Sequence, residues 1–236
     1  DRGQYGGNLI VSSVIPPSSL NPITSDSVGV TDITHMLFRS LLELNIESYE
    51  VKPNFAYAWK SDAEKLQWTF FLRDDLFWSD GHRLTSDDIA FTFNDIILNP
   101  KIKSVYKNML MVGTGKISVR AKDNQIEFTL PRSTSTFLSI IATVPILPRH
   151  IYQKAVAEDR FDQELAITTA PESLVVNGPF QLESLSKEAA VFKRNPQYFK
   201  KNIFGDKLPY LDSLTIQFVS SLDHALIKLL VGEIDI

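Results

Sequence analysis

Four histidines, His35, His82, His150 and His224, are the side chains of this sequence best suited to bind a metal ion or transfer a proton near neutral pH. They lie far apart along the chain, and none has the His-x-x-x-His or Glu-adjacent spacing of a zinc hydrolase. A surface or helix-capping role is the favoured interpretation for each of them. The sequence therefore predicts no metal site.

Covalent nucleophiles are also missing from the sequence. It contains no cysteine, which excludes a catalytic thiol, a thiolate metal site and a disulfide bond. It has no Gly-x-Ser-x-Gly segment, the usual nucleophile turn of an α/β serine hydrolase. The segment Gly113-Thr114-Gly115-Lys116 differs from a phosphate-binding loop in its glycine spacing, and Ile117 follows where Ser or Thr would bind magnesium. A turn before a strand explains this segment better.

Asp87 and Asp88 form a carboxylate pair that could take part in acid–base catalysis. Adjacent residues on a helix point to different faces, however, and acids in the first turn interact favourably with the helix dipole. Thr85-Ser86-Asp87-Asp88 resembles a capping box with Asp in place of Glu, ahead of apolar residues at helical spacing. Helix capping is therefore the favoured role of this pair.

The composition is that of a folded protein with a sizeable core. The chain has 236 residues, of which 44% are hydrophobic, and its formal net charge is −4. An excess of acidic residues disfavours binding to a phosphate backbone. Trp59, Trp68 and Trp78 lie near several phenylalanines but only Arg73 is close to them, so these rings are expected in a core. We expect no nucleic-acid partner.

Neither a membrane span nor an export signal is visible in the sequence. The longest apolar runs, such as residues 140–147, are far below the roughly 20 residues needed to cross a bilayer. The chain does not open on a basic and then apolar leader, which indicates a cytoplasmic protein or one whose leader has been removed.

Apolar periodicity predicts a mixture of short strands and helices. A β-branched run over residues 9–15 predicts a buried strand. A helix that packs on it is expected from Ile33 through Leu41 and Leu44, capped by Thr31 or Asp32. The other expected strands cover residues 66–72, 117–120, 126–130, 180–185, 190–194 and 214–219, and the other expected helices cover residues 85–98, 136–142, 149–157 and 222–231.

The end of the chain has the pattern of an unfinished fold. Gly232 suits the end of the last helix, and Ile234-Asp235-Ile236 predicts the start of another strand rather than a frayed polar tail. We therefore expect this sequence to be a fragment of a longer protein.

An ordered series of motifs runs along nearly the whole chain. The series comprises Leu20-Asn21-Pro22, Phe38-Arg39-Ser40-Leu41-Leu42, Pro53-Asn54-Phe55-Ala56-Tyr57-Ala58-Trp59, Trp68–Gly81, Leu84–Ile89, Asn177-Gly178-Pro179-Phe180 and Gly232-Glu233-Ile234-Asp235. It resembles the bacterial extracellular solute-binding proteins of family 5, the peptide- and nickel-binding receptors of ABC importers. The block around Trp78-Ser79-Asp80-Gly81 is the most specific part. Departures are small, with Ala58, Ser86 and Ile89 in place of the common Ser, Ala and Val.

The resemblance implies a mixed α/β fold, the two-lobed clam shell of the type II periplasmic binding proteins. Residues 1–48 and 174–236 would form an incomplete first lobe, and residues 49–173 the small extra domain of the peptide-binding cluster. The opposing lobe would lie outside this chain, so half of the ligand cleft would be missing from it.

The resemblance also implies a function, that of an extracytoplasmic receptor rather than an enzyme. Such a receptor binds peptides, oligopeptides in particular, in the cleft and delivers them to the permease subunits of an ABC importer. We expect a monomer without a cofactor, located in the periplasm or on the extracellular face of the cytoplasmic membrane, with a lipid anchor as one means of attachment.

Ligand-facing positions follow from the same resemblance. The loop after Leu20-Asn21-Pro22 points to Asp26, Ser27 and Val28, a tyrosine after the second helix to Tyr106, and the inner loop of the first lobe to Asn177 and Gly178. Without a ligand role, Asp26 would cap a loop, Tyr106 would be a half-buried core aromatic, and Gly178 would make a turn.

Two alternatives stay open at this point. The same fold binds other solutes, and a nickel chelate, an oligosaccharide or an antibiotic could replace the peptide. A carboxylate-based hydrolase with a catalytic pair divided between two lobes is the enzyme alternative, although no nucleophile or metal set supports it.

Overall fold

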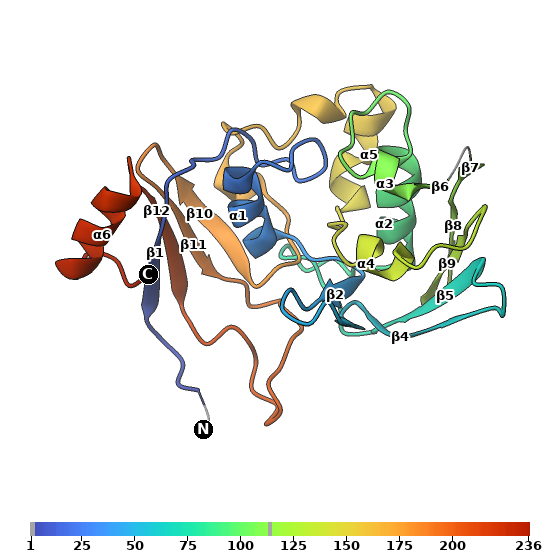
Figure 1. Ribbon diagram of the computed structural model, residues 1–236, viewed down its shortest axis with the longest axis horizontal. Helices are drawn as coiled ribbons and strands as arrows, with labels where there is room; N and C mark the ends of the chain where they lie inside the picture. The colour runs from blue at the N-terminus through green and yellow to red at the C-terminus, as the bar shows by residue number, and fades with distance from the viewer. Residues whose placement is uncertain (1–2, 113–114) are drawn as a thin grey trace.

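Two four-stranded sheets form the frame of the protein, whose computed structural model describes residues 3–112 and 115–236 (Figure 1). In the first sheet β1 (Asn8–Ser13) pairs in parallel with β12 (Ser213–Phe218), while the other pairs are antiparallel. Its strands, in spatial order, are β1, β12, β11 (Ala189–Arg194) and β10 (Phe180–Leu185). The second sheet is antiparallel, and its order is β4 (Ala56–Ser61), β5 (Gln67–Leu72), β9 (Gln125–Thr129) and β8 (Ser118–Lys122).

Smaller elements connect and cover these sheets. Two short antiparallel pairs are β2 (Leu42–Leu44) with β3 (Val51–Pro53), and β6 (Met111–Val112) with β7 (Gly115–Lys116). The helices are α1 (Val28–Leu37), α2 (Ser86–Phe91), the π-helix η1 (Thr92–Ile97), α3 (Lys107–Leu110), α4 (Phe137–Ile141), α5 (Arg149–Ala157), the 3-10 turns η2 (Phe161–Gln163) and η3 (Pro171–Ser173), and α6 (Leu222–Leu230). None of the helices in the described part of the chain is long and apolar enough to span a membrane.

The mixed α/β fold and most of the expected elements are confirmed. The hairpins β8–β9 and β10–β11 form as expected, and α5 covers the residues predicted for it. The capping box that begins at Thr85 is present at the start of α2, which confirms capping as the role of Asp88. Gly113 and Thr114 of the segment compared with a phosphate loop lie outside the described residues.

The helix expected from Ile33 to Leu44 is shorter than predicted. It ends at Leu37, and Leu42 and Leu44 belong to β2 instead. The Leu37 carbonyl accepts hydrogen bonds from the backbone N–H groups of Asn177 (3.2 Å) and Gly178 (2.8 Å). These two N–H groups replace the donor that a further turn of α1 would supply. The predicted start of the helix was also wrong, because its N-cap residue is Ser27 rather than Thr31 or Asp32.

Strand β1 is less buried than the prediction for residues 9–15 stated. It lies at the edge of the first sheet, ends at Ser13, and leaves Val14 and Ile15 exposed. The C-terminal segment lies beside this edge, where Asp235 N–H donates to the Ile10 carbonyl (2.8 Å) and Ser12 N–H to the Ile236 carbonyl (2.9 Å). Hydrogen bonds of this kind are the ones that an adjacent strand would make.

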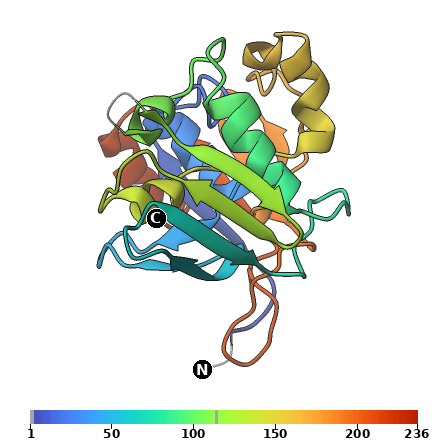
Figure 2. The same ribbon diagram turned by 90° about the vertical axis from the view of Figure 1, so that its right-hand side faces the viewer.

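The aromatic residues singled out in the sequence mostly form core. Trp68 and Phe70 of β5 contact Phe137 of α4, and Phe70 meets the ring of Phe128 edge to face at 5.5 Å. The buried side chains form a cluster that continues from the second sheet into the first. Figure 2 shows strands β5, β9 and β8 in front of the helices that cover their inner face.

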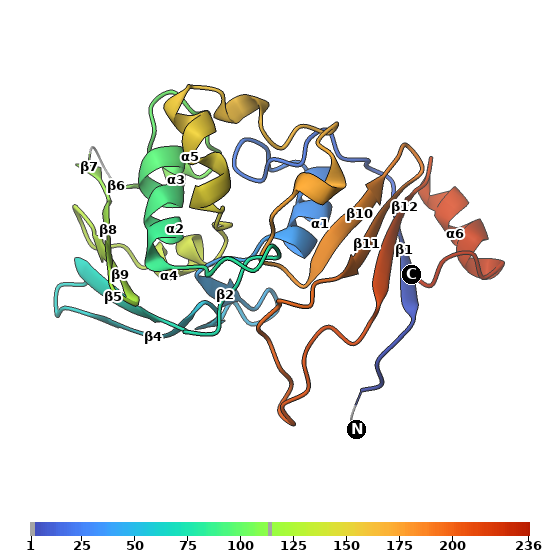
Figure 3. The same cartoon turned by 180° about the vertical axis from the view of Figure 1, so that it is seen from behind.

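Helix α6 differs from the other long helices. It lies on the outer side of the first sheet, beyond β1 and β12 (Figure 3), and none of its residues is buried. The predicted apolar positions Leu226 and Leu230 are exposed in the described structure.

The predicted division into residues 1–48 with 174–236 and 49–173 stays a prediction. The first sheet falls within the former set and the second sheet within the latter. The boundary at 48/49 lies in the turn between β2 and β3, and the boundary at 173/174 directly follows η3.

Candidate functional site

The predicted ligand-facing residues fall into two groups at opposite ends of α1. Asp26, Ser27 and Val28 lie at its start and are exposed, whereas Asn177 and Gly178 contact its last residue, Leu37. Ten residues of helix separate the two groups by about 15 Å, since each residue adds about 1.5 Å.

Tyr106 lies close to the first group. The backbone N–H of Val105 donates to the Ile23 carbonyl (3.0 Å), which joins the loop before α1 to the segment that precedes α3. Burial and, to a smaller extent, the negative charge of Asp26 raise the pKa of Tyr106 to about 12. Tyr106 therefore keeps its phenol proton and can donate a hydrogen bond beside an exposed carboxylate.

A pocket of about 280 Å³ lies next to these residues, along α1. Its polar lining includes both charged and neutral side chains: Thr31, Thr34, His35, Arg39, Ser40, Glu43, Asn54, Tyr106 and Thr143. His35 is exposed at its outer side, but the packing around its ring desolvates it in part, and this, reinforced by the positive charge of Arg39 and opposed by Asp32, lowers its pKa. The imidazole is therefore neutral at pH 7, and the pocket offers hydroxyl groups, the Arg39 guanidinium and the Glu43 carboxylate to a polar ligand.

His35 and Arg39 were not expected at a site. His35 was interpreted as a surface or capping residue, and Arg39 appeared only as part of a family motif. Their spacing of four residues would place them on one side of the helix predicted there, and this was the available signal. In the structure the Nε of Arg39 is buried and has no hydrogen-bond partner among the described residues.

The side chain of Asn177 links two other segments of the chain through hydrogen bonds. Its Oδ1 accepts a hydrogen bond from the Arg39 backbone N–H (2.7 Å), and its Nδ2 donates to the Ile146 carbonyl (3.1 Å). The side chain is buried, so both ends of its amide pair with backbone groups of the described structure. Ligand contact by Asn177 stays a prediction.

Gly178 is fixed by a close approach of two backbones. A Cβ atom at this position would lie 2.3 Å from the Met36 carbonyl oxygen, and the Gly178 carbonyl accepts a hydrogen bond from Asn195 Nδ2 (2.8 Å). Any larger residue would push α1 away from the start of β10. A backbone contact of Gly178 with ligand likewise stays a prediction.

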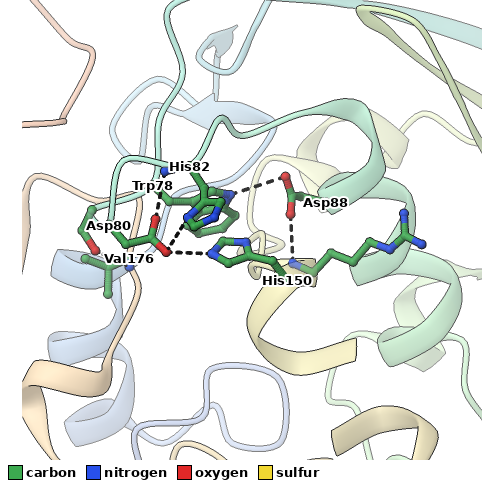
Figure 4. A network of polar contacts seen from close by, with 8 residues as sticks. Trp78, Asp80, His82, Asp88, His150 and Val176 are labelled. Carbon is green, nitrogen blue, oxygen red and sulfur yellow. Dashed lines mark hydrogen bonds and ion pairs between the residues drawn. The ribbon is translucent and has the colours of Figure 1, made fainter. Parts of the chain in front are cut away.

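A second polar network joins the loop after β5 to the start of α5 (Figure 4). Asp88 accepts hydrogen bonds from the Thr85 N–H (2.9 Å) and Trp78 Nε1 (3.4 Å) with one oxygen, and from the Arg149 N–H (2.9 Å) with the other. The same view shows Asp80 beside His82 and His150, two histidines that are 68 residues apart in sequence.

Comparison with known proteins gives a consistent result. Residues 50–236 match the model of the bacterial extracellular solute-binding proteins, family 5. A probable ABC transporter-binding protein of Deinococcus radiodurans is 27% identical over 98% of this chain and 40% of its own length. The chain spans about two fifths of the length of the curated relatives it matches.

Solved structures agree with that family match. The oligopeptide-binding protein AppA of Bacillus subtilis, in complex with a nonapeptide, has a TM-score of 0.83 at 26% identity, over 99% of this chain and 44% of AppA. AgaA of Agrobacterium tumefaciens R10, in complex with agropinic acid, has a TM-score of 0.81 at 21% identity, over 97% of this chain and 43% of AgaA. The likeness to AgaA shows the fold alone.

Proposed function

Since this chain belongs to the bacterial extracellular solute-binding proteins of family 5, we propose that it is part of a receptor that binds a peptide for an ABC importer. The family and the named relatives are substrate-binding proteins of ABC transporters rather than enzymes. The observation that carries the peptide proposal is the exposed loop of Asp26, Ser27 and Val28, which lies beside Tyr106 and the pocket along α1.

The loop of Asp26, Ser27 and Val28 together with Tyr106 would form one wall of the ligand cleft, where peptide recognition would use both charge and hydrogen bonding. The Asp26 carboxylate is exposed and suits a peptide N–H group or ammonium group, while the protonated Tyr106 hydroxyl suits a peptide carbonyl. Extended peptides are commonly bound through main-chain hydrogen bonds, which leaves their side chains loosely read. The name of AppA as an oligopeptide-binding protein supports this class of ligand.

The second wall of the cleft would come from the part of the full-length protein that corresponds to the uncovered length of the relatives. A ligand that contacts both walls binds the closed form more tightly than the open form, and it thereby shifts the population toward closure. We propose that the receptor is located outside the cytoplasmic membrane and that its closed form docks with the permease subunits.

The ligand is best identified by mass spectrometry of the full-length protein, first native and then denatured. A distribution of short peptides released on unfolding is the expected result. A single non-peptide mass, or nickel, would overturn the peptide proposal while leaving the fold assignment intact. If the protein carries no ligand, a thermal-shift screen with a peptide library decides, and the absence of any hit there would also overturn the proposal.

Substitutions test the wall itself. Asp26→Ala is expected to weaken peptide binding about 10- to 100-fold and Tyr106→Ala about 3- to 10-fold, because one charged and one neutral hydrogen bond are lost. Titration calorimetry of the full-length protein measures both changes. Asp95→Ala, at an exposed position on η1, is the matched control and should leave the affinity unchanged. Unchanged affinity in both test variants would remove Asp26 and Tyr106 from the site.

A further inference from the structure

Three side chains that can bind a metal ion meet at the start of α5 (Figure 4). Asp80 Oδ2 lies 3.0 Å from His82 Nδ1 and 2.8 Å from His150 Nε2. These three ligand atoms all lie within 4.8 Å of one another, and the two imidazole rings stack with centroids 4.2 Å apart. The cluster is separate from the pocket along α1, which none of the three residues lines.

A tight loop presents Asp80 and His82. The Trp78 N–H donates to the His82 carbonyl (2.8 Å) and the Gly81 N–H to the Trp78 carbonyl (2.9 Å). Gly81 has a φ of +88°, a conformation that side chains other than glycine rarely adopt, so it allows this reversal of the chain. Asp80 Oδ1 accepts a hydrogen bond from the His82 N–H (3.1 Å), which leaves Oδ2 directed at the two imidazoles.

His150 reaches the cluster from the first turn of α5. The Asp88 carboxylate fixes this turn by accepting a hydrogen bond from the Arg149 N–H, and the guanidinium of Arg149 is paired with Asp87 at 3.8 Å. The loop on the other side is also fixed, because Ser79 exchanges hydrogen bonds with the backbone of Val176. Both parts of the cluster are therefore held in place by groups outside it.

We propose that Asp80, His82 and His150 bind a divalent transition-metal ion of the Zn²⁺ class. Two imidazoles and one carboxylate are a common ligand set for zinc, which bonds to such atoms at about 2.0–2.1 Å. Ligand atoms around a tetrahedral ion of that size lie about 3.3 Å apart. The separations of 2.8 and 3.0 Å from Asp80 Oδ2 therefore need to lengthen by only a few tenths of an ångström, while His82 Nδ1 and His150 Nε2, which lie within 4.8 Å of each other, adjust to the same spacing.

Binding of the ion replaces the hydrogen bonds within the cluster. Each imidazole turns a lone pair toward the ion and carries its proton on the other ring nitrogen, so both rings bind as neutral ligands. The His82 ring can shift to complete the geometry, because its side chain is 65% exposed. The side chains of Asp80 and His150 are only about a quarter exposed, and they provide the fixed part of the site.

The site is open to solvent and joins two distant parts of the chain. Three protein ligands leave a fourth position of a tetrahedral ion for water or another small donor. The ion would bind the loop over residues 78–82 to α5, and a ligand that binds only the folded form stabilises it. The earlier prediction of no metal site relied on sequence spacing, which did not reveal that His82 and His150 are neighbours.

Calorimetric titration of the chelator-treated full-length protein with ZnCl₂ tests this proposal. The expected result is a site with a Kd of about 1 µM or tighter, which His82→Ala weakens at least about tenfold because a ligand is lost. His224→Ala, at an exposed histidine on α6, is the matched control and should leave this site unchanged. The absence of zinc binding, or equal binding by His82→Ala, would overturn the proposal.

Two further measurements keep the result interpretable. Circular dichroism and the melting temperature without metal establish that His82→Ala remains folded, which its exposure leads us to expect. Anomalous scattering at the zinc edge, from crystals grown with zinc, locates the ion. Density between Asp80 Oδ2, His82 Nδ1 and His150 Nε2 supports the site, and zinc bound only elsewhere overturns it.

Discussion

Two carboxylates of one segment, Asp80 and Asp88, both link the loop after β5 to the start of α5, but with different kinds of donor. Asp88 is buried and accepts hydrogen bonds from two backbone N–H groups and one indole N–H, which can only donate. Asp80 lies near the surface and accepts from one backbone N–H and two imidazoles, which can change their proton position or bind a metal ion.

The contrast separates a structural carboxylate from one that can serve a ligand. Partial burial alone would raise the pKa of Asp80, but hydrogen bonds from His150 and His82 outweigh it and lower the pKa. Asp80 is therefore ionised at pH 7 and is ready to bind a cation. Exchangeable donors, rather than the number of hydrogen bonds, distinguish the two positions.

The largest effect is expected from Asp88→Ala. This change leaves three N–H donors without their acceptor at a position that is 5% exposed, so it should lower the free energy of unfolding by about 3 kcal/mol. Urea denaturation measures the change. Asp87→Ala removes an exposed carboxylate from the same turn and should change stability by less than about 0.5 kcal/mol. Similar values for the two variants would contradict the structural role of Asp88.

Asp88→Asn is expected to have a smaller but still large effect. The amide oxygen can accept from the donors on one side, while its NH₂ group must then face an N–H donor on the other. We expect a loss of about 2 kcal/mol, because one buried donor stays unpaired and a repulsive contact is added. The same denaturation measurement applies. Stability close to that of the unsubstituted protein would show that the donors around Asp88 can be satisfied in another way.

The comparison also shows what sequence patterns can reveal. The capping box predicted Asp88 as a structural residue, because Thr85, one of the three partners of its carboxylate, lies within the local motif. Strand alternation predicted the hairpins of both sheets for the same reason, since each hairpin is specified by neighbouring residues. Local order in this chain was therefore predictable from local sequence.

Features that depend on distant contacts were not predictable. Apolar spacing continues to Leu44, but α1 ends at Leu37 because Asn177 and Gly178 bind its last carbonyl from 140 residues away. His82 and His150 are neighbours in a structure in which Asp88 binds the first turn of α5, 61 residues further along the chain. Asp26 and Tyr106 were selected from the family resemblance, and their contact with ligand stays a prediction.

The smallest effects are expected at Asp80, measured with a chelator present. Asp80→Ala should lower the free energy of unfolding by about 1 kcal/mol, since the donors it leaves are partly exposed to water. Asp80→Asn should lower it by less than about 0.5 kcal/mol, because its NH₂ group can donate to both imidazoles once their protons move to the other ring nitrogens. Urea denaturation measures the difference between the two variants, and ¹⁵N chemical shifts of the histidine rings report the tautomer.

The Asn variant also bears on the proposed metal site, because zinc requires the same ring nitrogens to give up their protons. If Asp80→Asn is as damaging as Asp80→Ala and the ring shifts do not change, His82 Nδ1 and His150 Nε2 are locked as donors. The cluster would then resemble the network around Asp88, and zinc binding at this position would lose its chemical basis. If the tautomers do change, the two carboxylates differ as proposed, in whether their donors can become acceptors.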